Sequence, residues 1–372
     1  MRNFDYSTLA GLPWPQGLEG ALDKVGRLQA SLAEADRGRS RFAALHEEQA
    51  LVSCAAHCCA IDGREIDDRR LFDVACGIAA PASLEEQEAL GVFEAMQDIL
   101  VRHASMDVSP AAILALHRIM EGHARPEQAG RFKRRPNSLA RDWPGQEEMA
   151  RVETLAPEEA PQALDALCQA WKRASARRDV DRVMLAGFTV ADFLVIAPFA
   201  RRNGRMSRLL TMLLLCKAGH APVVCALTSV VMKKCQEVYA GALTAACGVW
   251  SQGWSYPMLF AGAMLEMLGD AYVAFNDMRR MLDGVVAPLA KAVKAMFGGL
   301  GEAGTALAYA FLQAGGRFTT ADAARACPEL DRRTLLKLLK ELEAQGLVVR
   351  RGSGRGTSWE ASSRLSRLSR LR

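Results

Sequence analysis

The stretch Ile196-Ala197-Pro198-Phe199-Ala200-Arg201-Arg202-Asn203-Gly204-Arg205-Met206-Ser207-Arg208 decides how this chain is interpreted. It follows an apolar segment and opens a second helical one, and Gly204 lets the backbone come close to an anion. Arg205 and Arg208 are three positions apart, so on a helix both face one site. Guanidinium groups and a helix N-terminus both suit phosphate oxygens. The stretch is therefore compatible with a phosphate site.

The same stretch resembles the signature loop of the Fic (Fido) family of protein-AMPylating enzymes. The family pattern is His-Pro-Phe-x-Asp/Glu-Gly-Asn-Gly-Arg-x-x-Arg, and the matching positions here are Pro198, Phe199, Asn203, Gly204, Arg205 and Arg208. The resemblance implies that Asn203, Gly204, Arg205 and Arg208 hold the phosphates of ATP or another nucleotide. It implies that Arg208 contacts the terminal phosphates.

Three departures from the pattern concern the chemistry. Ala197 stands where the general-base histidine belongs, Arg201 where the magnesium-holding carboxylate belongs, and Arg202 where the first glycine belongs. Losing a general base typically costs ~10²–10⁴-fold in rate, and an arginine cannot ligate magnesium. The side chain of Arg202 could also distort or fill the phosphate cradle. We therefore expect no catalytic residue, no metal ion, weak nucleotide binding at most and little or no AMPylation.

A second resemblance concerns regulation. Many Fic proteins carry an inhibitory helix with Ser/Thr-x-x-x-Glu-Gly/Asn, whose glutamate pairs with the last arginine of the loop. The segment from Cys58 to Gly63 resembles that helix end, with Asp62 in place of the glutamate. The alternative is that Asp62-Gly63 only ends a helix.

The basic segment from Ala129 to Asn137 resembles the Gly-x-Phe-Arg-like segment of Fic proteins, which the flap follows. The flap is a short β-hairpin that pairs with a target peptide by strand addition. The residues that carry this resemblance are Gly130, Phe132 and Lys133. An ordinary basic loop is the alternative. If the flap interpretation holds, the partner there is a target protein.

Composition predicts a mainly α fold, because half of the residues are apolar, aromatic residues are few and apolar positions recur at helical spacing. The combined expectation is a Fic-type helical core with a small β-hairpin flap, followed by a winged-helix domain. The N-terminus lacks a secretion signal, and polar residues interrupt the most apolar stretch, 209–232, so two core helices are expected there rather than a membrane span. We expect a cytoplasmic protein without membrane attachment.

The ten cysteines show no paired spacing typical of zinc sites and are expected to be buried apolar side chains. A helix over 18–33 is expected before the core, and the helices expected in the core are 43–60, 84–103, 110–120, 162–174, 181–196 and 203–217, with more up to about 297. Gly298-Gly299-Leu300-Gly301 is the clearest linker. The expected division is an N-terminal helical appendage (1–41), the Fic-like domain (42–297), a winged-helix domain (302–361) and a basic tail (362–372).

The winged-helix expectation rests on three helices followed by a hairpin. One helix should run from Gly304 to Ala314, one should follow Thr319 and Thr320, and a third should run from Arg332 to Gln345 before two short strands. Leu335, Leu338, Leu339 and Leu342 should form the core stripe of the third helix. The basic residues expected to face DNA are Arg332, Arg333, Lys337, Lys340, Arg350, Arg351 and Arg355.

Charge supports that expectation, since residues 301–372 carry 13 Lys and Arg against 7 Asp and Glu, in a chain whose net charge is +5. Such domains also bind proteins or only pack on a neighbour. Three functions stay open: a nucleotide- or anion-sensing regulator that binds DNA, a transferase with residual or altered phosphate-donor chemistry, and a protein-interaction scaffold. The sequence leaves the oligomeric state open.

Overall fold

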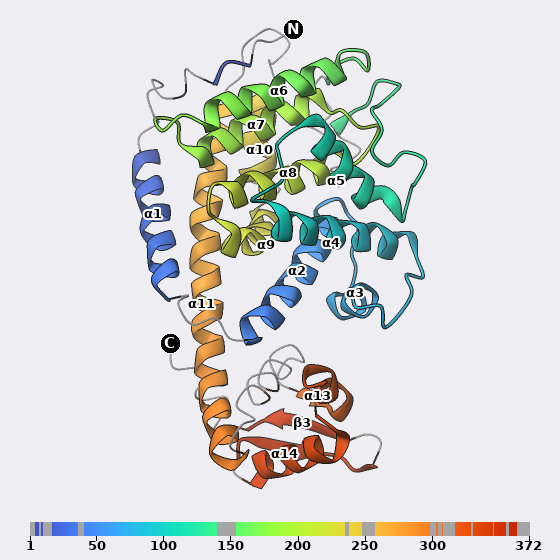
Figure 1. The fold of residues 1–372 in the computed structure, drawn as a ribbon, viewed down its shortest axis with the longest axis vertical. Helices are drawn as coiled ribbons and strands as arrows, with labels where there is room; N and C mark the ends of the chain where they lie inside the picture. Colours follow the sequence, from blue (N-terminus) through green and yellow to red (C-terminus); the bar gives the residue numbers. More distant parts are fainter. Residues whose placement is uncertain are drawn as a thin grey trace. The chain divides into compact units, whose positions relative to one another are not determined.

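The computed structural model describes residues 4–6, 9, 17–35, 41–139, 154–234, 238–247, 257–297, 303, 307, 317–328, 330–344, 346–354 and 357–362. The chain divides into two compact units. Unit 1 comprises Met1–Ser31 and Gln49–Val273, and unit 2 comprises Leu32–Glu48 and Ala274–Arg372. The mainly α fold expected from the sequence is confirmed (Figure 1).

Helices make up almost all of the described part of unit 1. In chain order they are α1 (Leu18–Ala35), α2 (Arg41–Ile61), α3 (Asp68–Ala75), α4 (Leu84–Arg102), α5 (Pro110–Gly122), α6 (Ala160–Ser175), α7 (Arg182–Ile196), α8 (Asn203–Lys217), the 3-10 helix η4 (Ala221–Val223), α9 (Val224–Lys234), α10 (Ala240–Cys247) and α11 (Pro257–Phe297). The last of these and the first two continue into unit 2. The two helices expected within 209–232 are confirmed as the end of α8 and as α9.

Helices α7 and α8 form the centre of unit 1, between α6 on one side and α4 and α5 on the other (Figure 1). Every residue of α7 from Val183 to Ile196 is buried. The Asp181 side chain begins this helix by accepting the N–H groups of Val183 and Met184. The apolar run that precedes the arginine-rich loop is therefore the core helix that fixes the start of the loop.

Two glycines let helices approach closely. A Cβ on Gly91 would lie 2.2 Å from the carbonyl oxygen of Met120, so α4 and α5 meet backbone to backbone. A Cβ on Gly187 would lie 2.6 Å from Ala261, so α7 and α11 do the same. These two close contacts hold α4 against α5 and α7 against α11, and α4, α5 and α7 all contact α8.

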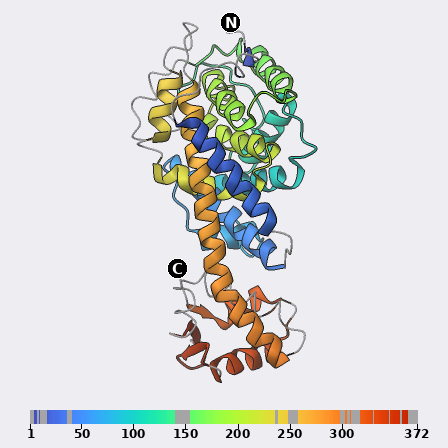
Figure 2. The ribbon, with the colours of Figure 1, turned by 90° about the vertical axis from the view of Figure 1, so that its left-hand side faces the viewer.

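Residues 1–31, which belong to the expected N-terminal appendage, are grouped with unit 1. The hydroxyl of Tyr6 donates a hydrogen bond of 2.7 Å to the buried Asp192 in α7. Leu18 and Val25 of α1 lie against Gly262 and Gly269 of α11 (Figure 2). The expected boundary at residue 297 coincides with the end of α11, whereas packing divides the chain earlier, after Val273.

Within the described residues, one helical stretch, Pro257–Arg280, is long and apolar enough to cross a membrane. Half of its most apolar window is buried inside the structure. The core helix of a soluble protein has the same length and composition, so the stretch is weak evidence for a membrane span.

Unit 2 contains a small antiparallel sheet and two helices among its described residues 317–362. The elements are β1 (Arg317–Thr319), α13 (Thr320–Ala326), α14 (Arg332–Ala344), β2 (Val348–Arg351) and β3 (Ser358–Ala361), and the strand order is β1-β3-β2. Trp359 of β3 pairs with Phe318 on one side and with Arg350 on the other. The expected helix from Gly304 to Ala314 lies mostly outside the described residues.

The predicted ends and core of unit 2 are confirmed. Thr319 and Asp322 form a reciprocal capping box at the start of α13, and the Asp331 side chain accepts the N–H groups of Arg333 and Thr334 at the start of α14. The buried stripe of α14 is Leu335, Leu338, Leu339 and Leu342. Strand β1, which the sequence did not indicate, adds Phe318 to this core.

Candidate functional site

The loop between α7 and α8 is held by two residues in the left-handed region. Ala197 ends α7 with φ 41°, and Arg202 precedes α8 with φ 62°. They are the only non-glycine residues with positive φ among those the structure describes. Such a conformation costs on the order of 1–3 kcal/mol and persists only where the surroundings enforce it. Arg202, which stands where the family pattern has a glycine, therefore adopts a backbone conformation that favours glycine.

Asn203 holds the loop together rather than pointing outward. Its Oδ1 accepts the N–H of Phe199 at 3.0 Å, and its Nδ2 donates to the Phe199 carbonyl at 2.8 Å. The Phe199 ring stacks on the ring of His117, with centroids 3.7 Å apart. Burial lowers the pKa of His117 to about 3, so this imidazole is neutral at physiological pH. Asn203 thus has a structural role in this conformation.

The segment after α5 braces the other side of the loop. The N–H of Lys133 donates to the Pro198 carbonyl at 2.8 Å, and its Nζ donates to Asn137 Oδ1 and to the Ile196 carbonyl. Asn137 Nδ2 in turn donates to the carbonyls of Ala197 and Phe199. Lys133 is buried, which lowers its pKa to about 8.

The described residues of this bracing segment, up to Leu139, include no strand, and residues 140–153 lie outside the described part of the chain, so the flap at this segment stays a prediction. Gly130 has a φ of 68° and donates its N–H to His117 Nδ1, and Phe132 is half-buried. The backbone of the segment bonds to the loop at Pro198 instead of to a second strand.

Asp62 lies against both signature arginines. Its Oδ2 accepts from Arg205 Nε at 2.9 Å, and its Oδ1 accepts from Arg208 Nη2 at 2.5 Å. Arg208 also donates from Nη2 to the Cys58 carbonyl at 2.9 Å and from Nε to the Cys58 sulfur at 3.2 Å. Gly63 follows with φ 72° and ends the turn after α2. The contact expected between Asp62 and Arg208 is therefore present, and Arg205 shares it.

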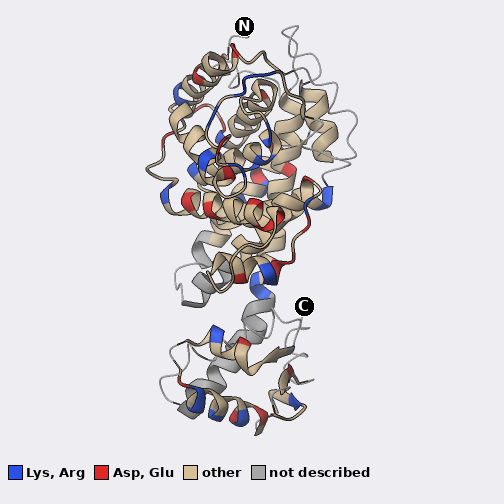
Figure 3. Ribbon diagram, turned by 90° about the vertical axis from the view of Figure 1, so that its right-hand side faces the viewer, with Lys and Arg blue, Asp and Glu red and all other residues tan. Residues whose placement is uncertain are grey.

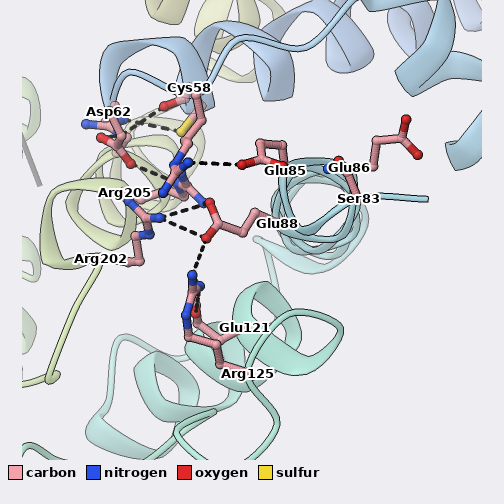
Figure 4. A network of polar contacts seen from close by, with 12 residues as sticks. Cys58, Asp62, Ser83, Glu85, Glu86, Glu88, Glu121, Arg125, Arg202 and Arg205 are labelled. Atoms are coloured by element: carbon pink, nitrogen blue, oxygen red, sulfur yellow. Dashed lines mark hydrogen bonds and ion pairs between the residues drawn. The ribbon is translucent and has the colours of Figure 1, made fainter. Parts of the chain in front are cut away.

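Glu88 of α4 is a second carboxylate in the cluster, which sequence reasoning missed. Its Oε1 accepts from Arg202 Nη2 at 2.8 Å and from Arg125 Nη2 at 2.6 Å, and its Oε2 accepts from Arg205 Nη1 at 3.2 Å. Figure 4 shows Glu88 between Arg202 and Arg205 on one side and Arg125 on the other. Glu88 is fully buried, and Arg202 and Arg205 are 3% and 0% exposed, so the three groups form an interior ionic cluster.

The guanidinium groups of the cluster keep the Glu88 carboxylate ionised. Burial by itself would raise the pKa of Glu88, but the guanidinium groups of Arg205 and Arg202 outweigh that effect and lower its pKa to about 2. Glu121, which pairs with Arg125 at 3.1 Å, has its pKa raised because burial outweighs its cationic neighbours. Glu88 is therefore anionic throughout the physiological range.

Comparison with known proteins identifies this architecture. The model of the Fic/DOC family matches residues 107–215, which include α5, α6, α7, the loop and α8 up to its last turn. The chain carries a Fic/DOC-family domain.

Two curated relatives are named Protein adenylyltransferase Fic. The one from Nematostella vectensis is 25% identical over 173 residues, and the one from Drosophila ananassae is 28% identical over 214 residues. These matches cover 45% and 52% of this chain but only 38% and 39% of the relatives. The similarity therefore concerns less than half of those longer proteins.

Solved structures show the same fold. A Fic family protein from Desulfovibrio desulfuricans G20 has a TM-score of 0.57 at 18% identity, covering 95% of this chain and 98% of its own. Fic-1 of C. elegans (aa134–508) has a TM-score of 0.56 at 18% identity, covering 70% of this chain and 72% of its own. At this identity the likeness concerns the fold alone.

The residues of this Fic domain do not fit a magnesium ion at the family's position. Arg201, which replaces the carboxylate of the pattern, is exposed and offers no oxygen ligand. Arg202 and Arg205 place further positive charge beside it. Among the described residues no group of three or more His, Cys, Asp or Glu could hold a metal. In the His57-Cys58-Cys59 run, His57 bonds to Ser229, and Cys58 bonds to Arg208.

Unit 2 presents the second predicted site. The four basic side chains of α14, Arg332, Arg333, Lys337 and Lys340, are exposed and line one hollow together with Leu336. In the ribbon of Figure 3 the Lys and Arg positions of this helix are blue. Arg350 and Arg351 of β2 are also exposed, and Arg351 pairs with Glu360 at 3.0 Å. Arg355 lies outside the described residues.

Proposed function

We propose that this protein is a Fic-domain regulator that does not transfer AMP and that binds duplex DNA through unit 2. The ionic cluster is the observation that supports the absence of AMP transfer. Arg205 and Arg208, the groups that the family resemblance assigns to phosphate, are engaged by Asp62 and Glu88 of the same chain. A phosphate chain would have to displace two buried carboxylates before it could reach these arginines.

The residues of the loop support the same conclusion. AMP transfer needs a group that accepts the proton of the target hydroxyl, and the methyl group of Ala197 cannot do so. The basic side chain of Lys133 lies beside the loop, but its Nζ already donates to Ile196 and Asn137 and is buried. Since Arg201 replaces the metal ligand, the loop lacks both the proton acceptor of the usual reaction and the ligand for the metal ion that bridges the phosphates.

Incubation with α-labelled ATP and cell lysate tests this half. We expect no labelled protein with the natural chain, and labelling with the Ala197→His, Arg201→Asp, Arg202→Gly variant only if Asp62 is also replaced by asparagine. Labelling by the natural chain, lost on Arg208→Ala, would show a residual transferase and overturn the proposal.

The second half rests on the exposed basic face of unit 2. A helix with an apolar inner stripe and four outward cations, followed by a two-stranded hairpin, resembles the recognition helix and wing of a winged helix. Arg332, Arg333 and Lys337 lie in the N-terminal half of α14, the part that such domains place in the major groove. Arg350 in β2 is exposed, and in such an arrangement it would contact phosphates beside the groove.

A titration of fluorescent duplex DNA over a series of salt concentrations tests the second half. We expect the logarithm of the affinity to fall linearly with the logarithm of salt, by about 0.9 for each phosphate neutralised. The Arg332→Ala, Arg333→Ala, Lys337→Ala variant should lower both affinity and slope. The control Arg280→Ala changes an exposed cation in α11, which is outside the basic face, and should change neither. Undetectable binding at low salt would contradict DNA binding.

A further inference from the structure

The anion site of this Fic domain contains two separate internal anions. Asp62 reaches it from the end of α2 and contacts Arg205 and Arg208. Glu88 reaches it from α4 and contacts Arg202 and Arg205. Only Arg205 is shared, so removing one carboxylate leaves the other with at least two guanidinium partners, since Glu88 also pairs with Arg125.

The side chain of Arg202 allows Glu88 to occupy the site as its second internal anion. A glycine at this position would offer only its backbone, whereas Arg202 donates from Nη2 to both oxygens of Glu88, at 2.8 and 3.0 Å. The side chain is 3% exposed and therefore lies inside the cluster. Its strained φ of 62° shows that the surroundings maintain this placement at an energetic cost.

The cluster also has donor capacity that the carboxylates do not use. Arg205 Nη2 is buried without a hydrogen-bond partner among the described residues. A buried donor of this kind costs free energy unless it is bonded, so an anion that brings several oxygens would satisfy it. Arg202 immediately precedes α8, and Arg205 and Arg208 project from its first two turns, where the helix dipole adds positive potential.

We propose that Glu88, paired with Arg202, is a second internal lock on this site: a carboxylate that occupies the guanidinium groups in place of a ligand, independently of Asp62. When the ion pairs of both carboxylates are released, the site can bind a chain of phosphates without magnesium. The fixed guanidinium charges supply the neutralisation that a divalent ion would otherwise provide. This inference rests on the proposed loss of AMP transfer, since it assigns the site to binding without chemistry.

Calorimetric titration with inorganic tripolyphosphate in the presence of EDTA tests the inference. The proteins are the natural chain, Asp62→Asn, Glu88→Gln and the double variant. We expect the double variant to bind about tenfold or more tightly than Asp62→Asn, because an internal competitor for charged hydrogen bonds has been removed. Equal affinities of these two proteins would overturn the second lock.

Glu85→Gln is the matched control, since Glu85 lies on the same helix but pairs with Arg64 at a half-exposed position. On the Asp62→Asn background it should leave the affinity unchanged. If Glu88→Gln does not fold, as circular dichroism would show, Glu88→Asp on that background shortens the reach of the carboxylate and should also tighten binding. No gain in a folded Glu88→Asp variant would overturn the inference.

Addition of magnesium separates this inference from the proposed function. We expect the affinity of the double variant for tripolyphosphate to be no greater with magnesium than with EDTA. Binding that appears only with magnesium would overturn the inference. AMP transfer is measured in a different assay, so its presence or absence does not decide the result here.

Discussion

At the scale of single residues, Arg202 combines backbone strain with a buried ion pair. Replacing it by glycine removes the strain of the positive φ, worth on the order of 1 kcal/mol, but leaves Glu88 with fewer buried partners. We expect Arg202→Gly to lower the free energy of unfolding by about 1–2 kcal/mol, because the lost pair outweighs the relieved strain. Urea denaturation measures this change.

Ala197→Gly is the control for strain alone, since Ala197 has φ 41° and a methyl side chain that makes no ion pair. This variant should be unchanged in stability or more stable by up to about 1 kcal/mol. A stabilisation by Arg202→Gly as large as that by Ala197→Gly would contradict the role of the Glu88 pair.

The lowered pKa of Glu88 also predicts how the free energy of unfolding depends on pH. Its pKa in the folded protein is about 2, below the ordinary value of 4.5, so its stabilisation is complete above pH 4.5 and is lost as pH falls toward 2. The contribution is on the order of 3 kcal/mol. Acid denaturation of the natural chain should therefore be steeper between these pH values than that of Glu88→Gln. Parallel curves for the two proteins would contradict the lowered pKa.

At the scale of elements, the contact of α4 with α5 positions Glu88 and depends on Gly91. A Cβ there would lie 2.2 Å from the Met120 carbonyl oxygen, which belongs to backbone and cannot move aside. Gly91→Ala should destabilise the protein by about 1–3 kcal/mol. Gly122→Ala, at the end of α5 with open space around it, should be neutral or stabilising. Thermal unfolding followed by circular dichroism compares them, and equal melting temperatures would contradict the close contact.

The sequence predicted an element correctly where local residues mark both of its ends, and failed where the element depends on pairing with a distant segment. Helix α8 runs over the predicted residues, Asn203–Lys217, because the loop before it and the Ala218-Gly219 turn after it mark both ends. Strand β1 was not predicted, since its three residues form a strand only through pairing with the distant β3.

The site was predictable only in part. Asp62 could be found through the resemblance of its segment to an inhibitory helix. Glu88 could not, because a glutamate in an amphipathic helix has the pattern of a solvated side chain, and its partners Arg125 and Arg202 are remote in sequence. The abnormal arginine at position 202 was the one signal that a buried carboxylate should be sought.

At the scale of the whole molecule, the Fic domain and the basic unit carry different ligand chemistries. The arginines of the first are neutralised internally, whereas the basic side chains of α14 are exposed. We therefore expect magnesium and ATP to leave the affinity for duplex DNA unchanged in the natural chain. Fluorescence anisotropy with and without MgATP measures this, and a shift that disappears in Arg208→Ala would instead show that the two units communicate.

The most direct test of the internally closed site is calorimetric titration of the natural chain with ATP in the presence of magnesium. The structure predicts no saturable binding up to millimolar ATP, because Asp62 and Glu88 hold Arg205 and the loop offers no metal ligand. Saturable, magnesium-dependent binding that is lost on Arg205→Ala would contradict the closed site.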